Sequence, residues 1–413
     1  MKTGPFGFVI ICLFLTARAC LASPLDGIEI FGIRPDFYRL SVIKAELGIQ
    51  PSGVVAKPYR TIHGAIPANF AQWSPNGRFI AITSSRHSMA VNGKSISQTN
   101  SDWVDPIQIW DVSTGDKVAT LKPEGTYEES SALAWSPDGR FFAACTGSWD
   151  ANAIIWDAKT WKIVGEIPWP KGPSSCSSIS FSPDSKELAL GLSGVIADNR
   201  IVFYSTDSWK QIQKIKIHQA DMKVNGPIRF AFVPHTNSPV SDLVAAETTQ
   251  VPGRLFLITL QNSGSPQNEK LVSANSWIAY RSTMITQFAM SHHGMQFATG
   301  TLNGNINHYK GLPQIHSVRL WSTENGSKIA SPLDGLDEKS GFVHGLAYTF
   351  GDKYLAVGYA GITGTINLID PATFKIADVL HVNAPVEAVV ADPVAPLFAV
   401  TTSNGYLMVW RLR

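Results

Sequence analysis

A short unit of sequence recurs along this chain, and its repetition constrains the fold more than any other feature. Residues 73–81 and 135–143 begin with Trp-Ser-Pro, continue with Asn-Gly or Asp-Gly, and end in an apolar run that starts with Phe. Proline presets the φ angle of the first turn corner, and glycine supplies the positive φ of a later corner. The flanking apolar runs are typical of buried strands. Each unit therefore predicts two strands joined by a tight turn.

The unit continues through the chain in more divergent form, and a second signature follows each turn. This second signature is an apolar run that ends in Trp-Asp or a related pair. Its copies occupy residues 107–111, 154–157, 201–204, 255–258, 318–322, 367–370 and 407–410. Seven such units, with 43 to 62 residues between corresponding turns, cannot each bury both faces of a sheet alone, whereas units stacked radially can. The pattern predicts an all-β fold, a seven-bladed β-propeller.

The two signatures also point to a family. Ser-Pro-Asp-Gly at residues 136–139 and Trp-Asp at residues 110–111 and 156–157 resemble the repeats of the WD-repeat family of β-propellers, over about residues 53–413. The resemblance implies four strands in each blade, with the Trp at the end of the third. Typical repeats also carry a Gly-His before the first strand, which joins an Asp and the Trp in a buried hydrogen-bond network. No Gly-His precedes the blades here, so we expect the framework to depend more on packing than on polar networks.

The end of the chain bears on how the ring closes. Only three residues, 411–413, follow Trp410, so the last blade lacks an outer strand of its own. The family resemblance implies that a strand from the N-terminal side completes this blade, and residues 54–62 lie at the right distance before the first blade. Pro58 is tolerated there because an outer strand is the edge of its sheet. We expect this segment to close the ring.

The first 22 residues are typical of a secretory signal peptide. A positive start is followed by an apolar run too short to span a bilayer and by small residues before a cleavage point after Ala22. Its removal takes away Lys2 and Arg18, so the 34 basic residues become 32 and balance the 32 acidic ones. A neutral chain without a basic cluster excludes nucleic-acid binding. We expect an exported protein, periplasmic or secreted, with no membrane span after cleavage and an unassigned N-terminal extension over residues 23–52.

Candidate binding residues lie in the segments between strands, where rigid scaffolds usually carry function. By resemblance, the connections between second and third strands and between successive blades share one face, here called the loop face. We expect it to collect these aromatic and histidine residues: Trp103, Trp149, Trp169, Trp277, Tyr280, His308, Tyr309 and His316. Clustered aromatic side chains are typical of a recognition surface. The alternative is that each Trp packs beneath its own loop.

Signals for chemistry are weak by comparison. The sequence has no nucleophile elbow and no phosphate-binding glycine loop before a helix. His308 and His316 lack a tight ligand motif, so we expect neither a metal nor another cofactor. Two cysteines, Cys145 and Cys176, remain after cleavage. They end a second strand and open the first strand of the next blade, and a disulfide between them is possible in an oxidising compartment.

These observations favour an exported binding or scaffolding module without chemistry of its own. A protein partner would dock on the loop face through its Trp and Tyr side chains. The alternative is a periplasmic propeller enzyme, a hydrolase, lactonase or redox protein, with a site at the mouth of the channel. That alternative requires Asp, Glu or His side chains that converge on the propeller axis.

Overall fold

The structure is a computed structural model. It describes residues 55–84, 90–91, 94–95, 107–122, 129–147, 152–168, 174–194, 200–217, 228–234, 242–247, 253–259, 270–272, 275–280, 284–302, 318–331, 343–360 and 364–413. The chain divides into two compact units, Met1–Pro51 and Ser52–Arg413, and every described residue belongs to the second. The expected signal peptide and the residues 23–52 therefore lie outside the described residues. No described helix is long and apolar enough to cross a bilayer.

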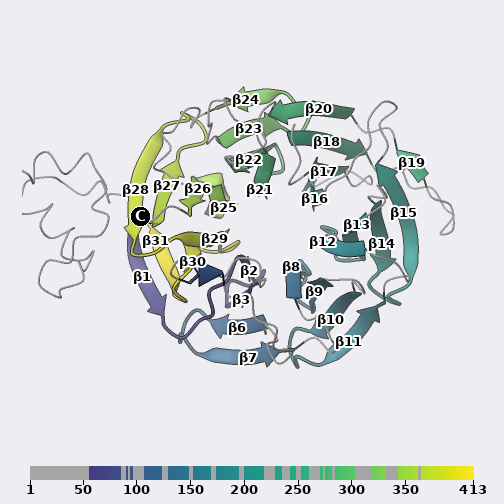
Figure 1. The fold of residues 1–413 in the computed structure, drawn as a ribbon, viewed down its shortest axis with the longest axis horizontal. Helices are drawn as coiled ribbons and strands as arrows, with labels where there is room; N and C mark the ends of the chain where they lie inside the picture. The colour runs from purple at the N-terminus through teal and green to yellow at the C-terminus, as the bar shows by residue number, and fades with distance from the viewer. Residues whose placement is uncertain are drawn as a thin grey trace, which may run out of the picture. The chain divides into compact units, whose positions relative to one another are not determined.

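Seven four-stranded antiparallel blades form a ring (Figure 1). Blade one consists of β2 (Phe70–Trp73), β3 (Phe79–Thr83), β6 (Ile107–Asp111) and β7 (Lys117–Leu121). Blade two consists of β8 (Glu129–Trp135), β9 (Phe141–Gly147), β10 (Asn152–Asp157) and β11 (Ile163–Ile167). Blade three consists of β12 (Ser174–Phe181), β13 (Glu187–Gly194), β14 (Arg200–Ser205) and β15 (Gln211–Ile217). Blade four consists of β16 (Ile228–Phe232), β17 (Asp242–Glu247), β18 (Gly253–Thr259) and β20 (Asn275–Tyr280). Blade five consists of β21 (Met284–Met290), β22 (Gln296–Leu302), β23 (Val318–Ser322) and β24 (Lys328–Ala330). Blade six consists of β25 (Val343–Tyr348), β26 (Leu355–Tyr359), β27 (Gly364–Ile369) and β28 (Ile376–Val382). Blade seven consists of β29 (Val386–Ala391), β30 (Leu397–Thr402), β31 (Leu407–Leu412) and β1 (Ala56–Ile62). The all-β, seven-bladed fold predicted from the repeats is confirmed.

The Ser-Pro-Asn-Gly turn between β2 and β3 shows why this sequence recurs. The Ser74 hydroxyl donates to Oδ1 of Asn76 (2.7 Å) and accepts from the Phe79 amide (2.8 Å). Gly77 adopts a φ of 72°, a conformation that costs glycine least. Blade two repeats the arrangement with Ser136 and Asp138. The motif therefore encodes a turn whose polar groups satisfy one another, which explains its recurrence without any functional role.

The Asp after the Trp of the third strand organises the next turn. The Asp111 carboxylate accepts hydrogen bonds from the Ser113 hydroxyl (2.5 Å) and amide (2.9 Å) and from Nε of Arg78 (2.8 Å). Desolvation opposes ionisation, but these hydrogen bonds outweigh it and lower the pKa of Asp111. Asp157 and Asp370 cap the corresponding turns in the same way.

Strand β1 closes the ring, as expected from the chain end. It pairs antiparallel with β31, with Pro58 opposite Trp410 and a register shift between Pro58 and Arg60 (Figure 1). The shift accommodates the residue that cannot donate to the ladder. Arg60 also donates to the carbonyl oxygen atoms of Ser113 (2.7 Å) and Thr114 (2.8 Å) in blade one. The predicted closure by the N-terminal strand is confirmed.

The core consists of seven buried clusters, one between each pair of neighbouring blades. Phe142 and Trp156, both at most 2% exposed, belong to the cluster between blades one and two. A fully buried side chain of this kind contributes about 1.5–3 kcal/mol. Because every blade shares an apolar face with each neighbour, no blade is independent of the ring.

Two short additions depart from the repeated plan. Strand β19 (Lys270–Val272) lies in the connection between β18 and β20 of blade four, yet it pairs in parallel with β15 of blade three. A hairpin of β4 (Ala90–Val91) and β5 (Lys94–Ser95) lies in the long connection between β3 and β6. Neither addition was predicted, and the pairing of β19 with β15 joins segments that are distant in sequence.

Candidate functional site

Six of the eight predicted docking residues lie outside the described residues. These are Trp103, Trp149, Trp169, His308, Tyr309 and His316. They fall in the connections that were expected to form the loop face, so their role stays a prediction. The other two, Trp277 and Tyr280, are described, and both lie in strand β20 rather than in a connecting loop.

Trp277 is half-buried and packs toward blade five. Its ring lies 6.0 Å from that of Trp321, measured between centroids. It also covers Gly326, where an added Cβ atom would lie 2.5 Å from the indole. For this residue the structure favours the packing alternative over display in a loop, because its apolar surface already covers a neighbouring turn.

Tyr280 is only 2% exposed and belongs to a buried hydrogen-bond network. Its hydroxyl oxygen lies 2.8 Å from Oγ1 of Thr299, which also accepts from the indole N–H of Trp321 at 2.9 Å. Arg319 stacks over the Tyr280 ring at 4.3 Å. A side chain this buried offers almost no surface to a partner, so for Tyr280 the structure favours packing over the predicted docking role.

Polar contacts to the Trp of the third strand occur in two blades, although the framework was expected to depend more on packing than on polar networks. Blade five joins the Trp of its third strand to a Thr and a Tyr, and blade one joins the indole N–H of Trp110 to Oε1 of Gln108 at 3.0 Å. The Gly-His of typical repeats is absent, and in these two blades other polar side chains lie beside the Trp, whereas the buried indole nitrogen of Trp410 in blade seven has no hydrogen-bond partner among the described residues. A buried indole N–H favours such a partner because an unsatisfied donor is costly.

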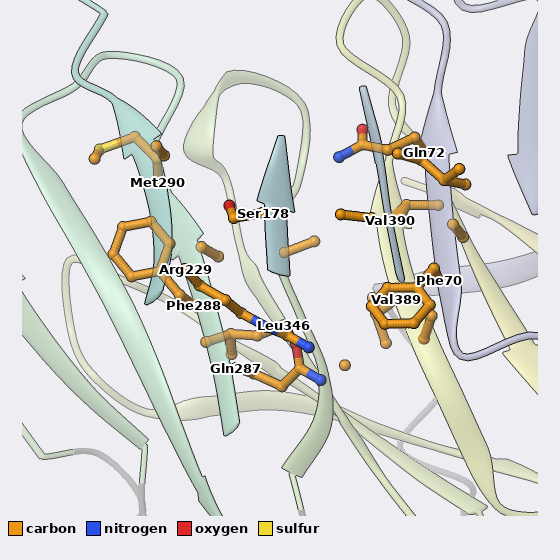
Figure 2. Close-up of a pocket in the computed structure, with 18 of the residues that line it drawn as sticks. Phe70, Gln72, Ser178, Arg229, Gln287, Phe288, Met290, Leu346, Val389 and Val390 are labelled. Atoms are coloured by element: carbon orange, nitrogen blue, oxygen red, sulfur yellow. The ribbon is translucent and has the colours of Figure 1, made fainter. Parts of the chain in front are cut away.

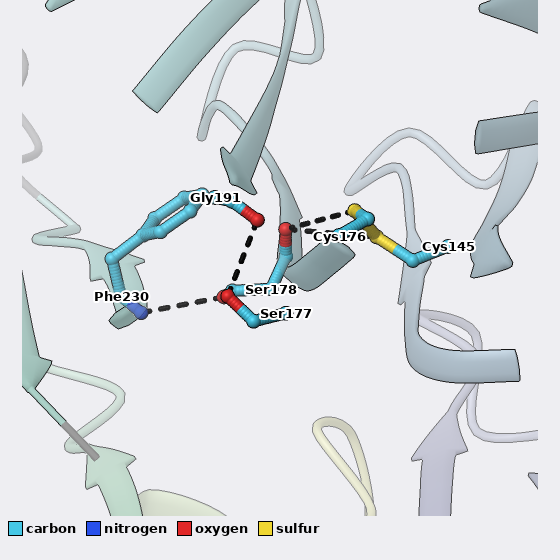
Figure 3. Close-up of a disulfide and its surroundings, with 6 residues drawn as sticks. All are labelled: Cys145, Cys176, Ser177, Ser178, Gly191 and Phe230. Atoms are coloured by element: carbon cyan, nitrogen blue, oxygen red, sulfur yellow. Dashed lines mark hydrogen bonds between the residues drawn. A yellow bond between two sulfur atoms is a disulfide. The ribbon is translucent and has the colours of Figure 1, made fainter. Parts of the chain in front are cut away.

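A disulfide joins Cys145 of blade two to Cys176 of blade three (Figure 3). The two Cα atoms are 5.6 Å apart, and both residues are at most 1% exposed. Both sulfur atoms lie close to the Ser178 carbonyl oxygen, at 3.7 and 3.6 Å. The Ser178 hydroxyl accepts from the Phe230 amide of blade four at 3.3 Å. The bridge therefore links neighbouring blades near the axis.

A cavity of 390 Å³ lies at the centre of the ring. The innermost strands of all seven blades line it: β2, β8, β12, β16, β21, β25 and β29. Its lining combines apolar and small residues with ten polar ones, among them Gln72, Arg229, Gln287 and His344. Its volume lies within the range of small-molecule sites.

Arg229 of β16 is the most polar group in this cavity. Its Nη1 donates to Oε1 of Gln287 at 3.1 Å, and its guanidinium lies 5.8 Å from the Phe70 ring centroid. Figure 2 shows Arg229 and Gln287 reaching toward each other from adjacent strands. Burial lowers the pKa of Arg229, yet a guanidinium stays protonated in proteins. Part of the Arg229 side chain faces the cavity, so Arg229 is half-buried.

A second polar pair lies where β25 and β29 begin. Nδ1 of His344 lies 3.4 Å from Oε2 of Glu387. Both residues occupy register shifts at the starts of their strands, and Ser177 and Thr286 occupy the same kind of shift in β12 and β21. Such bulges redirect side chains and recur next to functional sites. Of these four residues, Ser177 and His344 belong to the cavity lining.

Sequence reasoning missed Arg229 and Gln287, although a signal was present. Each lies three residues before the apolar residue that precedes a turn, Phe232 and Met290 respectively. The other blades carry uncharged residues at that position: Phe70, Ala132, Ser178, Gly345 and Ala388. Alignment of the repeats would have revealed one charge among seven inward positions. Among the described residues, no three His, Cys, Asp or Glu side chains form a group able to hold a metal.

Comparison with known sequences adds one match. The repeat described as WD domain, G-beta repeat matches residues 116–157. These residues run from the turn before β7 to the end of β10, so the matched repeat includes the outer strand of blade one and three strands of blade two. The sequence repeat is therefore offset from the blade, because it begins before the last strand of one blade and ends within the next blade. No curated protein gives a significant match to the chain.

Proposed function

This chain is a WD-repeat-like β-propeller, a fold that commonly serves as a protein-interaction scaffold, and from that premise we propose that it is an exported scaffold that binds a protein partner through its loop face. The observation that carries the proposal is that a closed, rigid ring carries connections of unequal length between its strands. The seven interblade clusters make the ring rigid. Loops on a rigid scaffold are common sites of recognition.

The connections that carry the predicted docking residues differ widely in length. Strand β3 ends at Thr83 and β6 begins at Ile107, whereas β30 ends at Thr402 and β31 begins at Leu407. The longest connection contains Trp103, and the one between β22 and β23 contains His308, Tyr309 and His316. Unequal connections on one scaffold favour a shaped surface that is specific for one partner.

Export is supported by two independent features. Residues 1–22 have the pattern of a signal peptide. The Cys145–Cys176 bridge is of the kind that persists in oxidising compartments. Both features favour a partner that is itself periplasmic or extracellular.

Site-specific photo-crosslinking tests the proposed docking face. A crosslinking amino acid at position 103 or 149 is expected to capture one protein in the native envelope or secreted fraction. The same amino acid at Lys159 or Lys186, in turns that the structure places between β10 and β11 and between β12 and β13, is the matched control. Equal capture from both sets of positions, or capture from neither, would contradict the proposal.

A further inference from the structure

We propose that the axial cavity binds a small organic monocarboxylate, with its carboxylate on the guanidinium of Arg229 and its apolar body against the inner strands. This site is separate from the loop-face partner and does not depend on it. The inference rests on the charge, the hydrogen bonding and the size of the cavity.

The charge of the cavity is unbalanced among the described residues. Arg229 is the one permanently charged residue in its lining, and the lining includes no Asp or Glu. The two lining histidines each contact a carboxylate: His344 contacts Glu387 at 3.4 Å, and His292 contacts Asp352 at 2.8 Å. No such carboxylate is within ion-pair distance of Arg229 in the described part of the chain. A charge that is partly removed from water favours an opposite charge or several hydrogen bonds beside it.

The hydrogen bonding of Arg229 is incomplete in the same way. A guanidinium has five N–H donors, and the described residues supply one acceptor, Oε1 of Gln287. The bond to Gln287 orients the guanidinium without neutralising it. A carboxylate accepts two parallel N–H bonds from an arginine, which suits the remaining donors.

The surroundings of Arg229 define the rest of the ligand. Phe70, Phe288, Leu346 and Val389 contribute apolar surface to the lining (Figure 2). A single fixed positive charge matches a single negative charge, whereas a phosphate dianion is better held by several cations or donors. The cavity volume of 390 Å³ suits a small molecule rather than a peptide segment.

The unaltered protein provides the first test. Calorimetric titration of the purified chain from residue 23 onward compares sodium hexanoate with hexanamide and sodium benzoate with benzamide, with inorganic phosphate as a third probe. We expect at least one carboxylate to bind at least tenfold more tightly than its amide and more tightly than phosphate, because hydrogen bonds between two charged groups are stronger than those to a neutral amide. The absence of carboxylate binding, equal binding of acid and amide, or tighter binding of phosphate would overturn the proposal.

A pair of variants locates the site. Arg229→Gln is expected to weaken carboxylate binding at least tenfold, whereas Arg140→Gln is expected to leave it unchanged. Arg140 is a suitable control because it pairs with Asp138 in an exposed turn outside the cavity, with Nε 2.6 Å from Oδ2. Unchanged binding by Arg229→Gln would overturn the proposal. Circular dichroism verifies folding, and if Arg229→Gln does not fold, the ratio of acid to amide binding on the unaltered protein decides.

Discussion

The hydroxyl oxygen of Tyr280 in blade four lies 2.8 Å from Oγ1 of Thr299 in blade five. Thr299 in turn accepts the indole N–H of Trp321 at 2.9 Å. One threonine thus joins the outer strand of one blade to two strands of the next. A polar side chain here adds directional hydrogen bonds to the apolar packing between two blades.

This relationship predicts an order of stability for two variants. Tyr280→Phe removes one hydroxyl and is expected to lower the free energy of unfolding by about 1 kcal/mol. Thr299→Val is expected to cost about 1–3 kcal/mol, since it leaves the Trp321 indole N–H without an acceptor. Urea unfolding measures both, and Tyr59→Phe at an exposed tyrosine (40% exposed) is the control. A Thr299→Val chain no less stable than Tyr280→Phe would contradict the network.

Closure of the ring by β1 predicts different effects for two N-terminal deletions. Removal of residues 23–62 takes away β1 and exposes the edge of β31, so cooperative unfolding is expected to be lost. Removal of residues 23–52 leaves β1 in place and is the matched control. Circular dichroism during thermal unfolding distinguishes the two. Equal cooperativity in both deletions would show that β1 does not complete the ring.

The disulfide predicts a redox-dependent stability. Cys145 and Cys176 close a loop with a sequence separation of 31 residues, for which chain entropy gives about 3–4 kcal/mol of stabilisation. The chain from residue 23 onward is expected to unfold at lower denaturant concentration after reduction. The Cys145→Ala/Cys176→Ala variant, which carries no thiol, is expected to be insensitive to reductant. Titration of two free thiols in the unfolded, unreduced protein would exclude the bridge.

Asp352 predicts a pH-dependent contact between blades five and six. Its carboxylate accepts from the amides of His292 (2.8 Å) and His293 (3.1 Å). Desolvation opposes ionisation, but the hydrogen bonds from His292 and His293 outweigh it and lower the pKa of Asp352 below its usual 3.8. A carboxyl group with a lowered pKa stabilises the fold above its unfolded pKa, and this contribution is lost as the pH falls through the folded value.

Asp352→Asn is the matched substitution for this contact. Asp352 has a φ of 54°, which asparagine also tolerates, so backbone strain stays unchanged. We expect a loss of about 1–2 kcal/mol between pH 5 and 8, which shrinks as the pH falls below 3.8. Urea unfolding at several pH values measures the difference between the two chains. A difference that stays constant down to pH 2 would show that the charge of Asp352 is not responsible.

Local sequence was sufficient wherever short-range contacts determine the structure. The turns of Ser74 and Asp111 satisfy their own polar groups within a few residues, so their motifs identify strand ends directly. Arg229 illustrates the opposite case. Its position in a cavity depends on seven inner strands that lie around one axis. The residues next to Arg229 in the sequence do not indicate this, and only an alignment of all seven repeats marks it as the one charged residue at that position.

The sequence by itself determined the blade count, the all-β class and the strand that closes the ring. The blade count and the all-β class follow from repeated turn chemistry, which is a local property of the chain, whereas the closing strand was implied by the family resemblance. Only the tertiary structure decided that Tyr280 is buried and that Arg229 faces a cavity among uncharged neighbours. The physical reason is that burial and charge balance depend on what other blades bring within a few ångströms, and those blades are distant in sequence.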